Sequence, residues 1–192
     1  MRNRIEHPKV FISYAWGSED YKIKVLSFAT DLMNDGIEVI LDQWSLKEGN
    51  DTYAFMEQSA TDPTITNVLI LLDPVYEKKA NGRDGGVGTE TQIISPEIYN
   101  KVKQEKFLPV IFERGIKGEI PKPQYLKTMF HFDLTQEEKY DLEYRRLVKR
   151  LYGIEIVEKP ELGKKPSWLD ERSTIPTKTR SGYEGLKQQK SD

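Results

Sequence analysis

The sequence predicts an α/β fold with a doubly wound, five-stranded parallel sheet in the strand order 2-1-3-4-5, the common order for five strands. Five short apolar runs alternate with segments whose apolar residues recur at helical spacing, over residues 9–152. Such alternation is typical of a parallel sheet that helices cover on both faces. The third run, NVLILL at 67–72, is apolar at almost every position, which predicts a central strand buried on both sides.

The first half of the chain has the pattern strand, helix, strand, helix. Residues 9–14 and 37–41 are apolar enough to form buried strands. Between them, Ser18 can cap a helix with an apolar face, and Gly36 suits its C-terminal end. Residues 42–50 form a polar loop in this prediction, and a short helix follows at about 51–60.

The second half continues the alternation after the central strand. A long loop is expected at 73–88, which ends in a glycine-rich stretch, and then a helix from about 89 to 103. Pro109 lies within the strand predicted at 107–112 and lacks a backbone N–H, which indicates a position near the sheet edge or a bulge.

The last predicted strand covers residues 129–134, and a final helix ends at Gly153. Thr135 and Glu138 have the spacing of a capping box for that helix. The sequence therefore predicts one domain over 8–152. Residues 153–192 form a polar tail or linker, which we expect to be flexible because it has too few apolar residues to offset its ordering entropy. Alternatively, Trp168 and Leu169 anchor a docking peptide.

Composition excludes several classes of function. The chain has 192 residues and no cysteine, so disulfides, thiolate zinc sites and cysteine nucleophiles are excluded. With two histidines a multi-histidine metal cage is not expected, and we predict no metal site. The formal net charge of −2 gives no reason to expect direct nucleic-acid binding. No apolar run approaches a membrane span, so we predict no membrane partner and a cytoplasmic location.

Topology predicts where a ligand would bind. In doubly wound sheets, ligands bind outside the carboxyl ends of the strands, at the point where the strand order reverses. Here the reversal falls between the first and third strands. The loops at 15–18 and 73–88 should therefore flank the site, with the loop at 42–50 beside them.

Two of these loops carry aromatic or apolar side chains. Tyr14, Trp16 and the backbone amides before the first helix could hold the base and phosphate of a nucleotide, or the two rings could simply pack at the sheet edge. Trp44 and Leu46 are apolar positions in a segment expected at the surface. They could anchor an interface or fold back over the sheet edge.

Glu90 follows the glycine-rich stretch and falls at the start of the predicted helix, facing the predicted cleft. A carboxylate beside a sugar can stabilise positive charge at the anomeric carbon. Alternatively, Glu90 only complements the dipole of the helix. Glu97 is the rival carboxylate. It lies seven residues later, about two helical turns, so both side chains could share a face.

Three segments in order resemble the SEFIR branch of the TIR-domain superfamily in its bacterial form. They are residues 9–16 (KVFISYAW), residues 36–49 (GIEVILDQWSLKEG), and residues 79–94 (KANGRDGGVGTETQII) followed by FLPVIF at 107–112. The resemblance covers residues 8–152 and leaves the tail unmatched. It implies a flavodoxin-like fold, which agrees with the topology predicted from the apolar runs.

The resemblance implies two kinds of function. Some TIR-like domains are NAD⁺ glycohydrolases or ADP-ribosyl cyclases in bacterial antiphage immunity, with NAD⁺ as substrate and no cofactor, and others are adaptors that signal by homotypic assembly. The hydrolases use a glutamate at the start of the helix after the third strand, which by position is Glu90. Many plant and animal TIR domains carry tryptophan where Gly86 stands here, so the choice between Glu90 and Glu97 remains open.

Carried over to this chain, the resemblance gives each candidate residue a role. Glu90 would hold the ribose hydroxyls and offset the charge of an oxocarbenium ion, as the catalytic residue. The residues that would line the pocket are Tyr14, Ala15 and Trp16. Those that would close over the nucleotide or contact a neighbouring subunit are Asp42, Trp44, Leu46 and Lys47. The expected partners are further copies of the chain and a sensor or effector protein. A third option is an enzyme like the nucleoside deoxyribosyltransferases, which share the broad fold and also use a glutamate.

Overall fold

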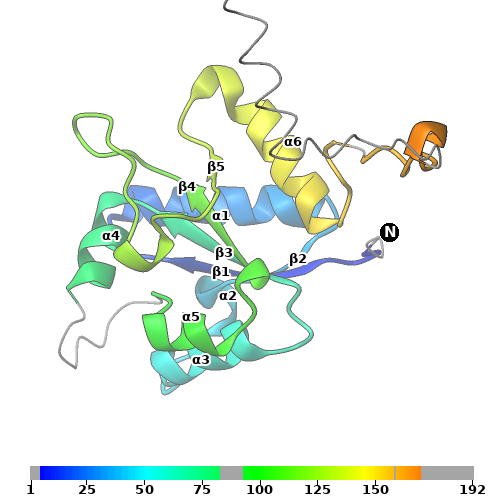
Figure 1. Cartoon of the computed structure of the whole chain (residues 1–192). Helices are drawn as coiled ribbons and strands as arrows, with labels where there is room; N and C mark the ends of the chain where they lie inside the picture. Colours follow the sequence, from blue (N-terminus) through cyan, green and yellow to red (C-terminus); the bar gives the residue numbers. More distant parts are fainter. Residues whose placement is uncertain (1–4, 83–92, 158, 170–192) are drawn as a thin grey trace, which may run out of the picture. The chain divides into compact units, whose positions relative to one another are not determined.

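The structure is a computed structural model that describes residues 5–82, 93–157 and 159–169. The chain divides into two compact units, residues 1–157 and 158–192. In the described part of the second unit, Ser167–Leu169 forms a single turn of 3₁₀ helix, η4. The first unit contains every strand found among the described residues and is the unit in which the candidate site lies (Figure 1).

The sheet confirms the predicted fold class and strand order. Five parallel strands are arranged in the order β2-β1-β3-β4-β5. All six residues of β3 are buried, as a central strand requires. The strands are β1 (Lys9–Tyr14), β2 (Glu38–Ile40), β3 (Asn67–Leu72), β4 (Phe107–Ile111) and β5 (Phe132–Asp133).

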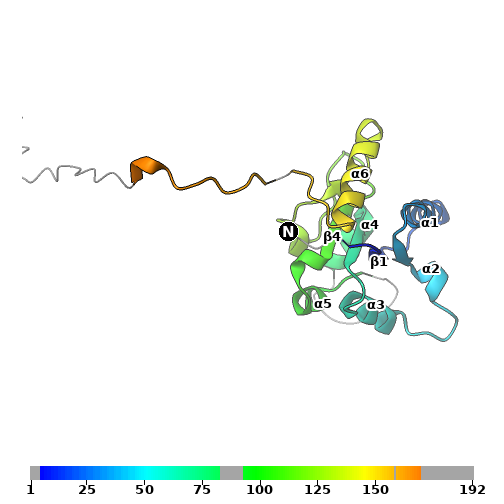
Figure 2. The ribbon, with the colours of Figure 1, turned by 90° about the vertical axis from the view of Figure 1, so that its right-hand side faces the viewer.

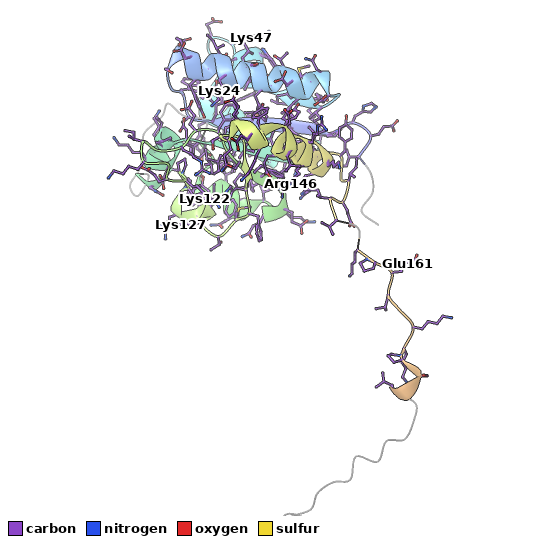
Figure 3. The ribbon with its side chains drawn as sticks, turned by 90° about the horizontal axis from the view of Figure 1, so that it is seen from above. Lys24, Lys47, Lys122, Lys127, Arg146 and Glu161 are labelled. Carbon is purple, nitrogen blue, oxygen red and sulfur yellow. The ribbon has the colours of Figure 1, made fainter. Side chains whose placement is uncertain are left out.

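Helices cover both faces of the sheet, and the side chains of each strand alternate between the two layers. α1 (Glu19–Asn34) and α6 (Tyr140–Leu151) pack on the face that receives Val10, Ile12 and Tyr14. The two helices contact each other, since the rings of Phe28 and Tyr144 lie 6.3 Å apart. Figure 3 shows them from above, with Lys24 labelled on α1 and Arg146 on α6.

The opposite face is covered by α3 (Thr52–Thr61), α4 (Pro74–Asn81) and α5 (Pro96–Lys101). Phe11 and Ala15 point into this second layer, where Met56 of α3 and Tyr76 of α4 are fully buried. Figure 2 shows α3 and α5 on the opposite side of β1 from α1 and α6. Short 3₁₀ turns complete the first unit: η1 (Gln104–Lys106), η2 (Gln124–Leu126) and η3 (Glu137–Lys139).

The prediction of a long loop over 73–88 is wrong in its first part, because Pro74–Asn81 forms α4. Asp73 caps this helix, with its Oδ1 accepting a hydrogen bond of 2.5 Å from the backbone N–H of Tyr76. Aspartate at the N-cap followed by proline at the first helical position is a strong signal for a helix start. That signal is present in the sequence, but the glycines further along obscured it.

The helix predicted over about 89–103 is shorter than expected. In the described residues it is α5, which starts at Pro96 after the N-cap Ser95, whereas residues 93–95 are not helical. Pro96 is the first residue of α5, a position where proline is tolerated because its missing N–H would have no partner there. The idea that Glu90 and Glu97 share one face of a continuous helix is wrong, because non-helical residues separate the two positions. Glu90 and Gly86 themselves lie outside the described residues.

Two further expectations need correction. The loop predicted at 42–50 contains a single helical turn, α2 (Asp42–Ser45). Thr135 does not cap the last helix, because its hydroxyl donates to Asp133 at 2.6 Å and accepts from Arg114 at 2.8 Å.

The predicted strand at 129–134 shortens to β5, which pairs with Val110 and Ile111 of β4. Pro109 therefore lies just beyond this pairing, next to the sheet edge as expected. None of the helices in the described ranges is long and apolar enough to cross a membrane.

Candidate functional site

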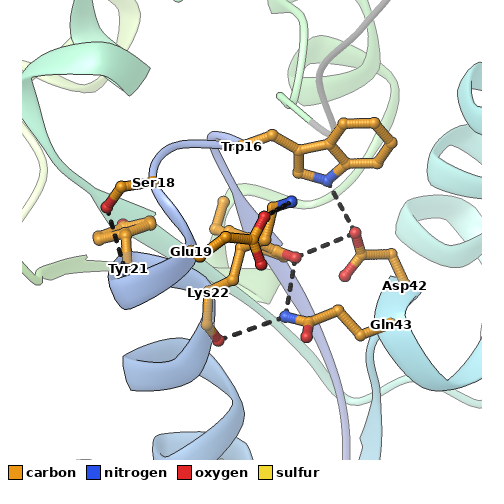
Figure 4. Close-up of polar contacts among 8 residues, drawn as sticks. Trp16, Ser18, Glu19, Tyr21, Lys22, Asp42 and Gln43 are labelled. Carbon is orange, nitrogen blue, oxygen red and sulfur yellow. Dashed lines mark hydrogen bonds and ion pairs between the residues drawn. The ribbon is translucent and has the colours of Figure 1, made fainter.

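Asp42 is the centre of a hydrogen-bonded cluster at the carboxyl edge of the sheet. It is the first residue of α2, separated from the end of β2 by Leu41 alone, and its exposed fraction is 4%. Its Oδ2 accepts hydrogen bonds from the Tyr14 hydroxyl at 3.1 Å and from the Trp16 indole N–H at 2.7 Å (Figure 4). One carboxylate oxygen thus ties the end of β1 and the loop after it to α2.

Burial raises the pKa of the Asp42 carboxyl above its usual value, although the hydrogen bonds from Tyr14 and Trp16 partly offset that effect. Oδ1 is buried as well and has no hydrogen-bond partner within the described ranges. Burial also raises the pKa of Tyr14, and the nearby Asp42 carboxylate raises it further. Tyr14 therefore keeps its proton and remains a hydrogen-bond donor at neutral pH.

Gln43 extends the cluster to α1. Its Nε2 donates to the Tyr14 hydroxyl at 3.1 Å and to the backbone carbonyl of Lys22 at 3.4 Å (Figure 4). On the other side of the loop, Lys79 of α4 donates to the backbone carbonyl of Trp16 at 3.4 Å. Sequence reasoning missed both residues. Gln43 carries no recognisable signal, and Lys79 belongs to a helix that was predicted as loop.

Three of the predicted site residues, Tyr14, Trp16 and Asp42, are brought together in this cluster. Trp16 is half-buried and packs against the core layer that contains α1. Tyr14 and Ala15 are fully buried, and Ala15 faces the opposite core layer. Trp16 is thus the side chain of the three in residues 14–16 that offers surface to a ligand.

The remaining predicted residues lie further out on α2 and the turn after it. Trp44 is 42% exposed, Leu46 is half-buried, and Lys47 is exposed. The turn is ordered, because the backbone N–H of Lys47 donates to Asn50 Oδ1 at 2.9 Å and the Asn50 N–H donates to the Lys47 carbonyl at 3.0 Å. In Figure 3, Lys47 lies at the margin of the molecule, above α1.

A second buried carboxylate, Asp73, lies at the end of β3. Its exposed fraction is 2%, and burial raises its pKa. Because β1 lies between β2 and β3, Asp42 and Asp73 follow the two strands on either side of Tyr14. Sequence reasoning placed Asp73 in a loop and gave it no role, although the Asp-Pro pair was a usable signal.

The backbone of Ile94 is hydrogen-bonded by two tyrosine side chains. The Ile94 N–H donates to the Tyr76 hydroxyl at 3.0 Å, and the Tyr125 hydroxyl donates to the Ile94 carbonyl at 2.6 Å. The Tyr76 hydroxyl also lies 3.2 Å from Ser13 Oγ on β1. Ile94 is therefore fixed against α4 and the first strand. The predicted catalytic residue Glu90 lies outside the described residues, and its role remains a prediction.

A depression of about 500 Å³ lies at the opposite, amino-terminal edge of the sheet, around Thr66, Asn67 and Lys106. Its polar groups serve the fold. Lys106 donates to the Asp62 carbonyl at 2.7 Å, and Asn67 Nδ2 donates to the Lys106 carbonyl at 3.3 Å. Within the described ranges, no group of three or more metal-ligating carboxylates or histidines lies together.

Comparison with known proteins gives one clear family. The model of the SEFIR domain family matches residues 8–141. The crystal structure of a prokaryotic SEFIR domain is similar to the chain at 44% sequence identity, with a TM-score of 0.68, and the match covers 82% of this chain and 99% of that one.

Two TIR domains are similar at lower identity. One is from the Toll-related receptor TRR-2 of Hydra magnipapillata, with 15% identity, 74% of this chain and 96% of that chain covered, and a TM-score of 0.49. The other comes from the activated Roq1 resistosome, with 16% identity, 77% and 85% covered, and a TM-score of 0.40. Among curated proteins, none matches the chain.

Proposed function

The chain belongs to the SEFIR domain family, and from this premise we propose that it is an NAD⁺ nucleosidase that becomes active on self-assembly and serves bacterial antiphage immunity. Its similarity to a prokaryotic SEFIR domain supports the bacterial setting. The observation that carries the proposal is the position of Trp16. Its indole is held by Asp42 at the carboxyl edge, where ligands of doubly wound sheets bind. An aromatic side chain fixed there can stack on a planar ring of a nucleotide.

The proposed reaction breaks the bond between the nicotinamide nitrogen and C1′ of the ribose. Both electrons of that bond go to the ring nitrogen, so nicotinamide leaves neutral and the ribose becomes an oxocarbenium ion. The oxygen of water then bonds to C1′ and releases its proton, which gives ADP-ribose. In a cyclase, a nitrogen of the adenine would take the place of water. The carboxylate of Glu90 offsets the positive charge, and electrostatic help of this kind is worth several kcal/mol.

Chain geometry supports Glu90 for this role. Glu90 precedes the anchored Ile94 by four residues, a separation that a chain spans with at most about 14 Å. Ile94 is held by Tyr76, whose hydroxyl also reaches Ser13 of β1. Ile94, four residues after Glu90 in the sequence, is thus held near the first strand, the strand from which Trp16 follows.

The test is NAD⁺ turnover by concentrated protein under conditions that promote assembly, with products separated by chromatography. Glu90→Gln should lower turnover about a hundredfold, the usual cost of removing a group that stabilises transition-state charge. Glu97→Gln is the matched control, with the same chemical change seven residues away, and should leave turnover near that of the wild type. Loss of turnover in Glu97→Gln alone would move the catalytic role to that residue. An inactive but assembled wild-type protein would reject the enzyme proposal.

A second candidate function is a non-enzymatic adaptor that assembles with other copies or with a sensor or effector protein. The exposure of Trp44 favours it, since a large aromatic side chain that is 42% exposed can anchor an interface. Particle size should then depend on Trp44, and Trp44→Ala should remain monomeric in sizing and electron microscopy. Assembly that depends on Trp44 with no consumption of NAD⁺ would favour the adaptor over the enzyme.

A further inference from the structure

We propose that Asp42 is a positioning residue that fixes the Trp16 indole at the carboxyl edge, and that it acts as a hydrogen-bond acceptor rather than through its charge. The part of this inference that concerns NAD⁺ rests on the proposed function. The part that concerns the position of the indole does not.

Asp42 sets the orientation of the Trp16 indole because the indole has a single hydrogen-bond donor. The ring N–H of tryptophan is its one polar group, so the acceptor that it meets sets the orientation of the ring. In the described ranges that acceptor is Asp42 Oδ2, at 2.7 Å. The acceptor comes from α2, whereas Trp16 follows β1, so a contact across 26 positions of the sequence sets where the ring lies.

Asp42 does not act on a ligand directly. Its exposed fraction is 4%, and its Oδ1 is fully buried. Oδ2 is already occupied by two donors, Tyr14 and Trp16. A ligand at the edge would therefore meet the half-buried indole and not the carboxylate behind it.

The negative charge of Asp42 is not paired with a cationic side chain in the described residues. No ion pair involving Asp42 is found in the described ranges, and Oδ1 accepts no hydrogen bond there. Both donors converge on one oxygen, and an asparagine can present an oxygen at that place. Asp42→Asn should therefore keep the indole where it is, and Asp42→Ala should release it.

The experiment isolates Trp16 as the only tryptophan of the chain. The sequence has three tryptophans, so the background Trp44→Phe with Trp168→Phe leaves Trp16 as the sole emitter. In this background, Asp42→Asn should keep the emission maximum and acrylamide quenching of the parent, whereas Asp42→Ala should shift emission to longer wavelength and increase quenching. Tyr14→Phe is the matched control, because it removes the other donor to Oδ2 and leaves the indole bond in place.

The same Asp42 substitutions, made in the wild-type chain so that Trp44 stays in place, test the consequence for the ligand through turnover. Asp42→Ala should raise KM for NAD⁺ about fivefold, the scale of one hydrogen bond, with a smaller change in kcat. Asp42→Asn should keep the wild-type KM. Equal loss of kcat in both variants would mean that the charge matters and would overturn the inference.

The fluorescence result separates this inference from the proposed function. Unchanged emission and quenching in Asp42→Ala would overturn the positioning role, whatever the turnover. Altered emission in Asp42→Asn would also overturn it, and this variant removes no side-chain volume, so the test holds even where Asp42→Ala does not fold. The expected fluorescence pattern in a chain that never consumes NAD⁺ would leave the positioning role standing and reject the nucleosidase.

Discussion

Asp42 and Asp133 show how the surroundings of a carboxyl set its contribution to stability. Burial dominates at Asp42 and raises its pKa. At Asp133 burial acts in the same direction, but hydrogen bonds from Thr135 and Arg114 outweigh it and hold the pKa below its usual value. The two residues should therefore give opposite pH dependences of folding.

Replacing each carboxyl with an amide tests this contrast. A raised folded-state pKa means that the stabilising contribution of Asp42 is present below its unfolded pKa and is lost as the pH rises through its folded pKa. Asp42→Asn should therefore gain stability relative to the wild type as the pH rises above about 4, the unfolded pKa of aspartate. The contribution of Asp133 is present above its unfolded pKa and is lost as the pH falls through its folded pKa. Asp133→Asn should therefore lose stability relative to the wild type as the pH rises toward about 4, and the difference should stay constant at higher pH. Urea unfolding at several pH values measures both, and trends of the same sign would contradict the assignment.

At the scale of elements, α4 depends on its N-cap. Asp73 accepts the hydrogen bond that starts the helix, and Lys79 in the last turn reaches the loop that carries Trp16. Loss of the cap should therefore affect both the helix and the loop.

Asp73→Ala should lower the free energy of unfolding by about 1 kcal/mol, the typical cost of a lost N-cap. Asp73→Asn keeps an acceptor for the Tyr76 N–H and should lose less. Thermal unfolding followed by circular dichroism compares the two. If Asp73→Ala were as stable as Asp73→Asn, the cap would not be what holds this helix.

The strands, helix α4 and the contact between Trp16 and Asp42 differ in how far the sequence predicts them. The strands were predictable because a buried parallel strand needs an apolar residue at nearly every position, as in β3. Asp73 and Pro74 are a signal for the start of α4. The glycine-rich stretch after them favours a loop, and for that reason the sequence prediction missed the helix. The bond between Trp16 and Asp42 could not be predicted, because it joins residues that are 26 positions apart and depends on the orientation of α2. The sequence was enough to propose Trp16 and Asp42 as site residues, but not to predict the hydrogen bond between them.

At the scale of the whole molecule, the fold rests on two core layers within the unit of residues 1–157. Leu147 and Leu151 of α6 are fully buried in one layer, so this last helix belongs to the core.

A chain that ends at Val157 should therefore keep the sheet and unfold cooperatively. A chain that ends at Lys139 lacks α6 and should fail to do so. Far-ultraviolet circular dichroism during heating distinguishes the two. A cooperative transition in the shorter chain would show that α6 is dispensable for the fold.

The two outer strands are also the shortest, with three residues in β2 and two in β5. Few unpaired backbone groups are left along either border to template another chain. Copies of this protein at high concentration should therefore have little tendency to join their sheets edge to edge through backbone hydrogen bonds. An ordered and reversible association would have to rely on contacts between side chains. A single substitution at such a contact can abolish the association.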